Sequence, residues 1–125
     1  MALTKSQIRA RIQSLTTQKN NNIAERTKYN NSLSYAKQLV KKIESSNSQM
    51  TTINKYMNDY FTINKKTADE GKINQVKEQI SSTLKKLNNT IIPSINSNIN
   101  NLTNNINRLE REINSLRRQY ETAPE

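Results

Sequence analysis

The chain has 125 residues, a formal net charge of +10, one glycine, two prolines, and no cysteine, histidine or tryptophan. The missing residue types exclude the usual zinc, haem, copper and iron–sulfur ligand sets, thiol catalysis and histidine-based triads. Only 32% of the residues are hydrophobic, which is too few for a thick globular core. We therefore expect a protein that is not an enzyme, with no catalytic residues, no metal site and no cofactor.

The first predicted element is a helix over residues of about 4–64, where apolar side chains recur at steps of three and four. Thr4 or Ser6 is expected to cap its start. The apolar stripe fades between Lys19 and Lys28, so packing should be poorest there. The poor helix formers of 44–48 do not change the phase of the stripe, which favours one continuous helix. The stripe consists of Ile8, Ile12, Leu15, Tyr29, Leu33, Ala36, Val40, Ile43, Met50, Ile53, Met57 and Tyr60.

Residues of about 65–72 are predicted to connect two helices, because they contain the only glycine, Gly71. In one interpretation Thr67 or Asp69 caps the second helix. In the other, the first helix extends to Glu70 and ends at Gly71, since glycine commonly follows a helix end. The chain reverses direction in either case.

The second predicted helix covers residues of about 73–121, followed by a loose tail at 122–125. From Ile99 onward its apolar residues alternate strictly at steps of three and four, which is a heptad pattern typical of coiled coils. Between Ile80 and Ile99 the steps are longer, so the supercoil should relax locally. The stripe consists of Ile73, Val76, Ile80, Leu84, Leu87, Ile91, Ile95, Ile99, Leu102, Ile106, Leu109, Ile113, Leu116 and Tyr120.

Pro93 lies inside this second helix, where it lacks an N–H and clashes with the carbonyl of residue 89. A kink or short break near 88–93 is the favoured interpretation, because the stripe steps across the proline from Ile91 to Ile95. A full reversal at this point would instead produce three helices.

These elements predict an all-α fold: a single domain of residues 1–125 that forms an elongated antiparallel helical hairpin with a second helix kinked near Pro93. In a two-helix hairpin each helix buries only the face that contacts the other helix, so apolar residues off the main stripes should stay partly exposed. Scattered apolar residues are common on protein surfaces, but contact with a helix of a partner protein is the favoured interpretation here. These residues are Tyr35, Tyr56, Phe61, Ile63 and Ile92.

The charge is interpreted as a solvated basic face, and the asparagine content either as a solvated polar face, which is favoured, or as a side-chain amide surface that pairs with another helix. Residues 1–64 contain 10 basic and 3 acidic side chains, so +7 of the net charge lies in the first helix. Basic residues cluster only in pairs and no aromatic spacing fits a stacking platform, so nucleic-acid binding is not expected. The 20 asparagines are densest over 96–107, where regular isoleucine and leucine spacing favours a helix with a polar outer face.

Three segments carry a resemblance to a known family: the start MALTKSQIRARIQSL, the interior YMNDYF, and the ending LEREINSLRRQYE. Together with the length and helical layout, they resemble the small helical partner proteins encoded beside LXG-domain toxins of Gram-positive type VII secretion. The chain is also similar in shape to the small WxG-type helical hairpins of that system. It departs from them in having no tryptophan and no tyrosine followed four residues later by an acid.

The resemblance implies a chaperone or targeting factor that binds the helical LXG domain of a toxin, with any export signal supplied either by the toxin or by a second small helical protein. The expected partner is therefore a helical protein, with no metal, no nucleic acid and no membrane span. No signal peptide is recognised at the N-terminus, so we expect synthesis in the cytoplasm; if the protein leaves the cell, it does so by a signal-independent route or with its partner. The expected interface is formed by Ile8, Ile12, Leu15, Leu33, Val40, Ile43, Met50, Ile53, Met57, Phe61, Ile99, Leu102, Ile106, Leu109, Ile113, Leu116 and Tyr120.

Two alternatives remain at this stage. The heptad pattern also suits a self-associating structural coiled coil, such as a phage or envelope spacer. The net positive charge leaves a basic nucleic-acid-binding helical protein as the weaker alternative.

Overall fold

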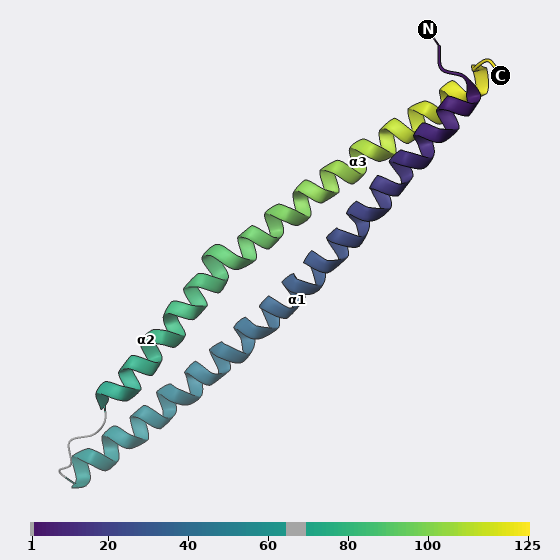
Figure 1. Ribbon diagram of the computed structural model, residues 1–125. Coiled ribbons are helices and arrows are strands. Elements are labelled where there is room, and N and C mark those ends of the chain that lie inside the picture. The colour runs from purple at the N-terminus through teal and green to yellow at the C-terminus, as the bar shows by residue number, and fades with distance from the viewer. Residues whose placement is uncertain (1, 65–69) are drawn as a thin grey trace. The chain divides into compact units, whose positions relative to one another are not determined.

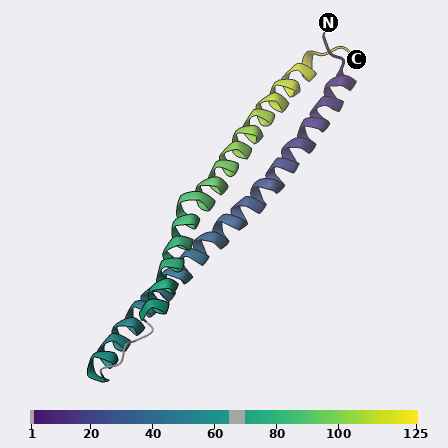
Figure 2. The same cartoon turned by 60° about the vertical axis from the view of Figure 1, so that its left-hand side comes forward.

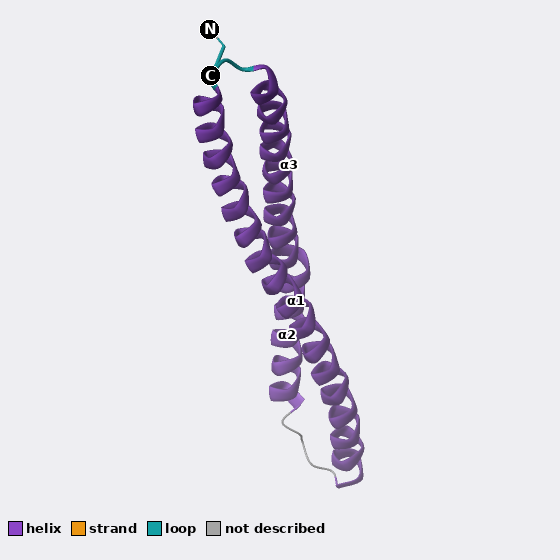
Figure 3. Ribbon diagram, turned by 90° about the vertical axis from the view of Figure 1, so that its right-hand side faces the viewer, coloured by secondary structure: helices purple, strands orange, loops and turns teal. Residues whose placement is uncertain are grey.

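The computed structural model describes residues 2–64 and 70–125, and leaves out the side chains at 54, 57, 58, 60–64 and 70–73. Helix α1 spans Lys5–Asn64, α2 spans Glu70–Lys86, a π-helix η1 spans Leu87–Ile91, and α3 spans Ile92–Thr122 (Figure 1). Every regular element in the described ranges is a helix, with no strand among them (Figure 3). The predicted all-α helical hairpin is confirmed.

The chain divides into two compact units, which are described one at a time. Unit 1 combines Met1–Ser32 with Ile95–Glu125, and unit 2 is Leu33–Ser94. The prediction of one domain over 1–125 is not tested by this division and stays a prediction.

In unit 1 the first part of α1 lies beside α3 and runs in the opposite direction, with both chain termini at the same end (Figures 1 and 2). The core of this unit is the heptad stripe of α3 closed against Ile8, which is only 1% exposed. On α3 the buried residues are Ile106, Leu109, Ile113 and Leu116. Their steps of three and four keep one narrow face of α3 against α1, as the strict spacing predicted.

The start of α1 is fixed by reciprocal capping. Gln7 N–H donates to Thr4 Oγ1 at 3.2 Å, and Thr4 N–H donates to Gln7 Oε1 at 2.9 Å. This is a capping box, which satisfies two donors that a helix start leaves free. Of the two predicted caps, Thr4 is therefore the one used. The Lys5 N–H also donates to the Pro124 carbonyl at 2.9 Å, so the segment 123–125 is tied to the helix start.

Polar bridges replace apolar packing where the first stripe fades. Arg26 donates to Thr103 Oγ1 at 3.4 Å, and the Lys19 ammonium lies 3.9 Å from Glu110. Ile23 between them is half-buried. Lys19 and Arg26 are themselves half-buried, so polar side chains take part in the contact between the two helices here.

Unit 2 pairs the remainder of α1 with α2. Among its described side chains Ala36, Val40 and Leu87 are buried, and Ala36 contributes little apolar surface. The segment 44–48 is helical, as predicted. Two threonines that follow it, Thr51 and Thr52, donate to carbonyls one turn earlier at 3.0 and 3.2 Å, which satisfies their hydroxyls within the helix.

The predicted interruption before Pro93 is a π-helical turn. The Ile92 N–H donates to the Leu87 carbonyl, five residues earlier, and the backbone remains helical from Glu70 to Thr122. The alternative of a chain reversal at Pro93 is therefore wrong. The extra residue in the turn shifts the seam by one position: Ile92 is half-buried, while Ile91 is 37% exposed. The predicted places of Ile91 in the seam and of Ile92 outside it were thus reversed.

The boundaries at the connection also differ from the prediction. Helix α2 begins at Glu70, three residues before the expected start, and Gly71 lies in its first turn. The predicted caps Thr67 and Asp69 lie outside the described residues.

Candidate partner-binding surfaces

The predicted interface residues fall into three groups in the structure. Those that are buried already pack inside the units, so they form the hairpin's own seam: Ile8, Val40, Ile106, Leu109, Ile113 and Leu116. Those that are half-buried line the edges of this seam: Ile12, Leu15, Leu33, Ile43, Met50, Ile99, Leu102 and Tyr120. Ile53 is 48% exposed, and the side chains of Met57 and Phe61 lie outside the described residues. Contact of any of them with a partner stays a prediction.

Among the side chains that the structure describes, the exposed large apolar ones all lie in unit 2. They are Tyr35 at 71%, Leu39 at 38%, Ile53 at 48%, Tyr56 at 69%, Val76 at 40% and Ile91 at 37%. The predicted exposure of Tyr35 and Tyr56 is confirmed, whereas Phe61 and Ile63 lie outside the described side chains. Leu39 was missed because it lies off the single stripe predicted for α1. Ile53, Val76 and Ile91 were assigned to the seam.

A groove of about 350 Å³ opens in unit 2 beside the π-helical turn. Its apolar lining comes from Val40 of α1 and from Ile92, which the π-helical turn brings toward the seam. Lys37, Lys41 and Glu44 border it on α1, and Asn88 borders it on η1. The groove thus joins an apolar floor to a rim with two positive charges and one negative charge.

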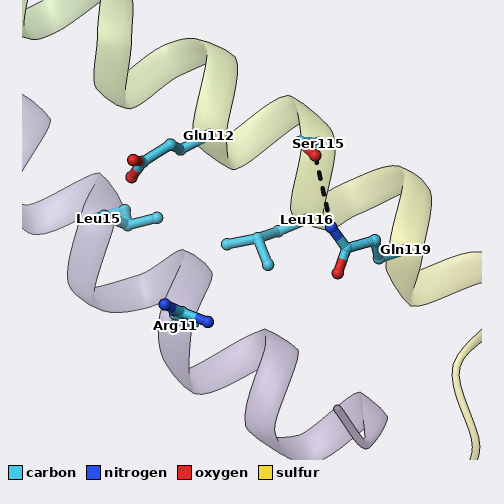
Figure 4. A pocket seen from close by; sticks show the side chains of 6 residues that line it. All are labelled: Arg11, Leu15, Glu112, Ser115, Leu116 and Gln119. Carbon is cyan, nitrogen blue, oxygen red and sulfur yellow. Dashed lines mark hydrogen bonds between the residues drawn. The ribbon is translucent and has the colours of Figure 1, made fainter. Parts of the chain in front are cut away.

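Unit 1 contains a smaller groove of about 220 Å³ between α1 and α3 (Figure 4). Leu15 and Leu116 meet at its base, with Arg11 and Glu112 on opposite walls. The Gln119 side-chain amide donates to Ser115 Oγ at 3.4 Å, so this hydroxyl is occupied as an acceptor. The arrangement is that of a coiled-coil seam with charged flanks.

A cation–π cluster lies where the two chain ends meet. The Lys5 ammonium is 5.4 Å from the centroid of the Tyr120 ring, and the Arg9 guanidinium is 5.6 Å from it. Lys5 also pairs with the Glu125 carboxylate at 3.4 Å. The Glu125 carboxylate is 94% exposed, so its ion pair with Lys5 contributes under about 1 kcal/mol, and each of the two cation–π contacts contributes on the order of 1 kcal/mol.

Within 2–64 and 70–125, no group of three or more acidic, histidine or cysteine side chains is placed to hold a metal ion. In the same part of the chain, no helix combines the length and apolarity needed to cross a membrane. No protein family, curated protein or solved structure matches the chain.

Proposed function

We propose that the chain is a non-catalytic helical adaptor that binds a helical domain of a second protein. Following the resemblance described above, that domain is the LXG domain of a toxin exported by type VII secretion, and the adaptor targets or stabilises the toxin for export. The single observation that carries the proposal is the groove at the π-helical turn of unit 2, with its apolar floor and basic rim.

The apolar floor supports binding of another helix. Val40 is buried at 9% exposure and Ile92 is half-buried, yet both reach the groove. Burial of apolar surface stabilises a complex by about 25 cal/mol per Å², so a leucine-sized side chain that fills the groove contributes on the order of 2 kcal/mol. Several such side chains along one helix are needed for a stable complex.

The rim sets the charge of the favoured partner. Lys37 and Lys41 lie one turn apart on α1, and Glu44 follows on the same rim. Two positive charges against one negative charge favour an acidic flank on the incoming helix, which raises the association rate and orients the helix. The concentration of net positive charge in residues 1–64 acts in the same direction.

The π-helical turn supports the assignment of this site. π-Helical turns are rare and occur frequently at functional sites, because the extra residue carries a cost that a regular helix avoids. Here the extra residue turns Ile92 toward the groove and leaves Ile91 exposed beside it. A partner helix that covers both residues would remove this exposed apolar surface from water.

Co-expression with the protein encoded by the adjacent gene, followed by size-exclusion chromatography, tests the proposal. We expect one co-eluting heteromer at micromolar concentration. The double reversal Lys37→Glu with Lys41→Glu should weaken binding about 10- to 100-fold, which corresponds to loss of two favourable charge interactions. The matched control, Arg117→Glu with Arg118→Glu, reverses two exposed charges in unit 1 and should leave binding unchanged. Separate elution of the two proteins, or equal weakening by both double variants, would argue against the proposal.

A further inference from the structure

A second heptad stripe runs along the part of α1 that belongs to unit 2. Several of its residues directly precede a residue of the main stripe: Tyr35 precedes Ala36, Leu39 precedes Val40, and Lys42 precedes Ile43. Its steps are 4, 3, 4, 3, 4 and 3, and all seven side chains are exposed. We name it the outer stripe, formed by Tyr35, Leu39, Lys42, Ser46, Gln49, Ile53 and Tyr56.

The outer stripe reads nearly the same in both directions. An aromatic and an aliphatic residue lie at each end, Tyr35 with Leu39 and Ile53 with Tyr56. Three polar residues occupy the middle, with the small Ser46 at the centre. Such a pattern is complementary to its own reverse, which is the requirement for a two-fold symmetric interface between identical chains.

We propose that two copies of the chain pair through the outer stripe, antiparallel, with the two-fold axis near Ser46. The apolar end formed by Tyr35 and Leu39 then packs against the apolar end formed by Ile53 and Tyr56 in the second copy. The polar middles of the two copies meet at the axis, where the small serine side chains permit close approach of the helices.

The charges of the stripe select the antiparallel arrangement. Lys42 is its only charged residue. In a parallel pair in register, the two Lys42 side chains would share one layer, which is unfavourable for like charges. In the antiparallel pair each Lys42 lies among the polar middle residues of the other copy. The position of Lys42 alone therefore favours antiparallel over parallel pairing, and no acidic residue is needed in the stripe.

The length of the stripe sets the size of such an interface. The stripe spans about 32 Å of helix. Two helices in contact over that length bury roughly 1,200 Å² in total, which is at the lower limit for stable interfaces. The pairing is therefore expected to be concentration-dependent in the micromolar range.

This surface differs from the one in the proposed function. The groove residues Lys37, Lys41 and Glu44 each directly follow a seam residue, whereas the outer-stripe residues Tyr35, Leu39 and Lys42 beside them each directly precede one. At 100° per residue, the two sets lie on opposite flanks of α1. Self-pairing thus leaves the groove open, and the inference goes beyond binding of a second protein.

Light scattering coupled to size-exclusion chromatography of the full chain tests the inference first. The mass should rise from 14.4 kDa toward twice that value between about 1 and 100 µM. Leu39→Glu should hold the mass at the monomer value, whereas the control Ser34→Glu adds the same charge at an exposed position on the opposite flank of α1 and should still dimerise. Circular dichroism checks that both variants stay helical. A monomer mass for the unchanged chain at 100 µM would overturn the inference.

A charge-swap mixture tests the antiparallel direction. Leu39→Glu and Ile53→Lys should each be monomeric alone. Mixed together they should form a heterodimer, because the new acid of one chain faces the new lysine of the other only when the helices run in opposite directions. No heterodimer in the mixture would overturn the antiparallel arrangement. If Leu39→Glu abolishes binding of the second protein while the unchanged chain is monomeric, the outer stripe belongs to that protein instead of a second copy.

Discussion

The heptad seam of unit 1 predicts a specific difference between two leucines of the same chain. Leu109 on α3 is 1% exposed, whereas Leu39 on α1 is 38% exposed. Substitution by alanine removes the same three carbon atoms at both positions. At about 0.8 kcal/mol per buried carbon, full burial gives roughly 2.4 kcal/mol for Leu109, and the residual cavity adds to this value. We expect Leu109→Ala to cost about 3 kcal/mol and Leu39→Ala about 1 kcal/mol.

Urea unfolding followed by circular dichroism measures this difference, with the protein kept near 1 µM so that self-association does not contribute. If the two units unfold in separate transitions, the cost of Leu109→Ala belongs to the transition of unit 1. Equal costs for the two substitutions would refute the assignment of Leu109 to a closed seam. A cost for Leu109→Ala near 1 kcal/mol would show that the seam is open to solvent at that point.

Three further predictions concern the cap, the π-helical turn and the charge. Thr4→Ala removes the capping box and should cost about 1 kcal/mol in urea unfolding, whereas Thr17→Ala, one of the exposed threonines within α1, should cost less. Deletion of Asn89 should leave the helicity unchanged, because it places Leu87 and Ile92 four residues apart, which is the spacing of a regular α-helical hydrogen bond. Deletion of Asn105 shifts the buried stripe of α3 by 100° and should abolish cooperative unfolding of unit 1. Addition of about 300 mM salt should strengthen self-pairing, because it screens repulsion between two chains of +10 each, while a nucleic-acid binder would instead lose affinity.

The sequence was informative wherever residue spacing alone decides the structure. Helix α1 could be predicted almost to the residue, and so could the buried face of α3, because Ile106 to Leu116 repeat strictly and alternatives would expose them. The location of the interruption before Pro93 followed from the missing N–H of proline.

The form of that interruption could not be predicted from the same rule. A π-helical turn and a kink both satisfy the backbone near Pro93, and they place opposite residues, Ile92 or Ile91, in the seam. Packing against Val40 and its neighbours decides between them, and such contacts between distant segments are not visible in a linear pattern. Leu39 was missed for a related reason: a strict second stripe on α1 contains polar residues in its middle and is therefore weak in hydrophobicity.

The candidate site required the structure for its definition. The sequence placed a partner interface along the main stripes, yet six of those residues are already buried within the units. Surface that remains for other chains lies on either side of the seam of unit 2, in the groove and along the outer stripe. The amino-acid pattern predicted that two helices leave apolar side chains exposed. The burial of each described residue then located these exposed side chains in unit 2.

Hydrogen–deuterium exchange on the heteromer formed with the adjacent gene product tests the central claim most directly. The account predicts new protection of amides in residues 37–44 of α1 and 88–92 around the π-helical turn, with little change over 106–116, where the seam is already closed. Protection confined to unit 1, or no stable heteromer at micromolar concentration, would contradict it.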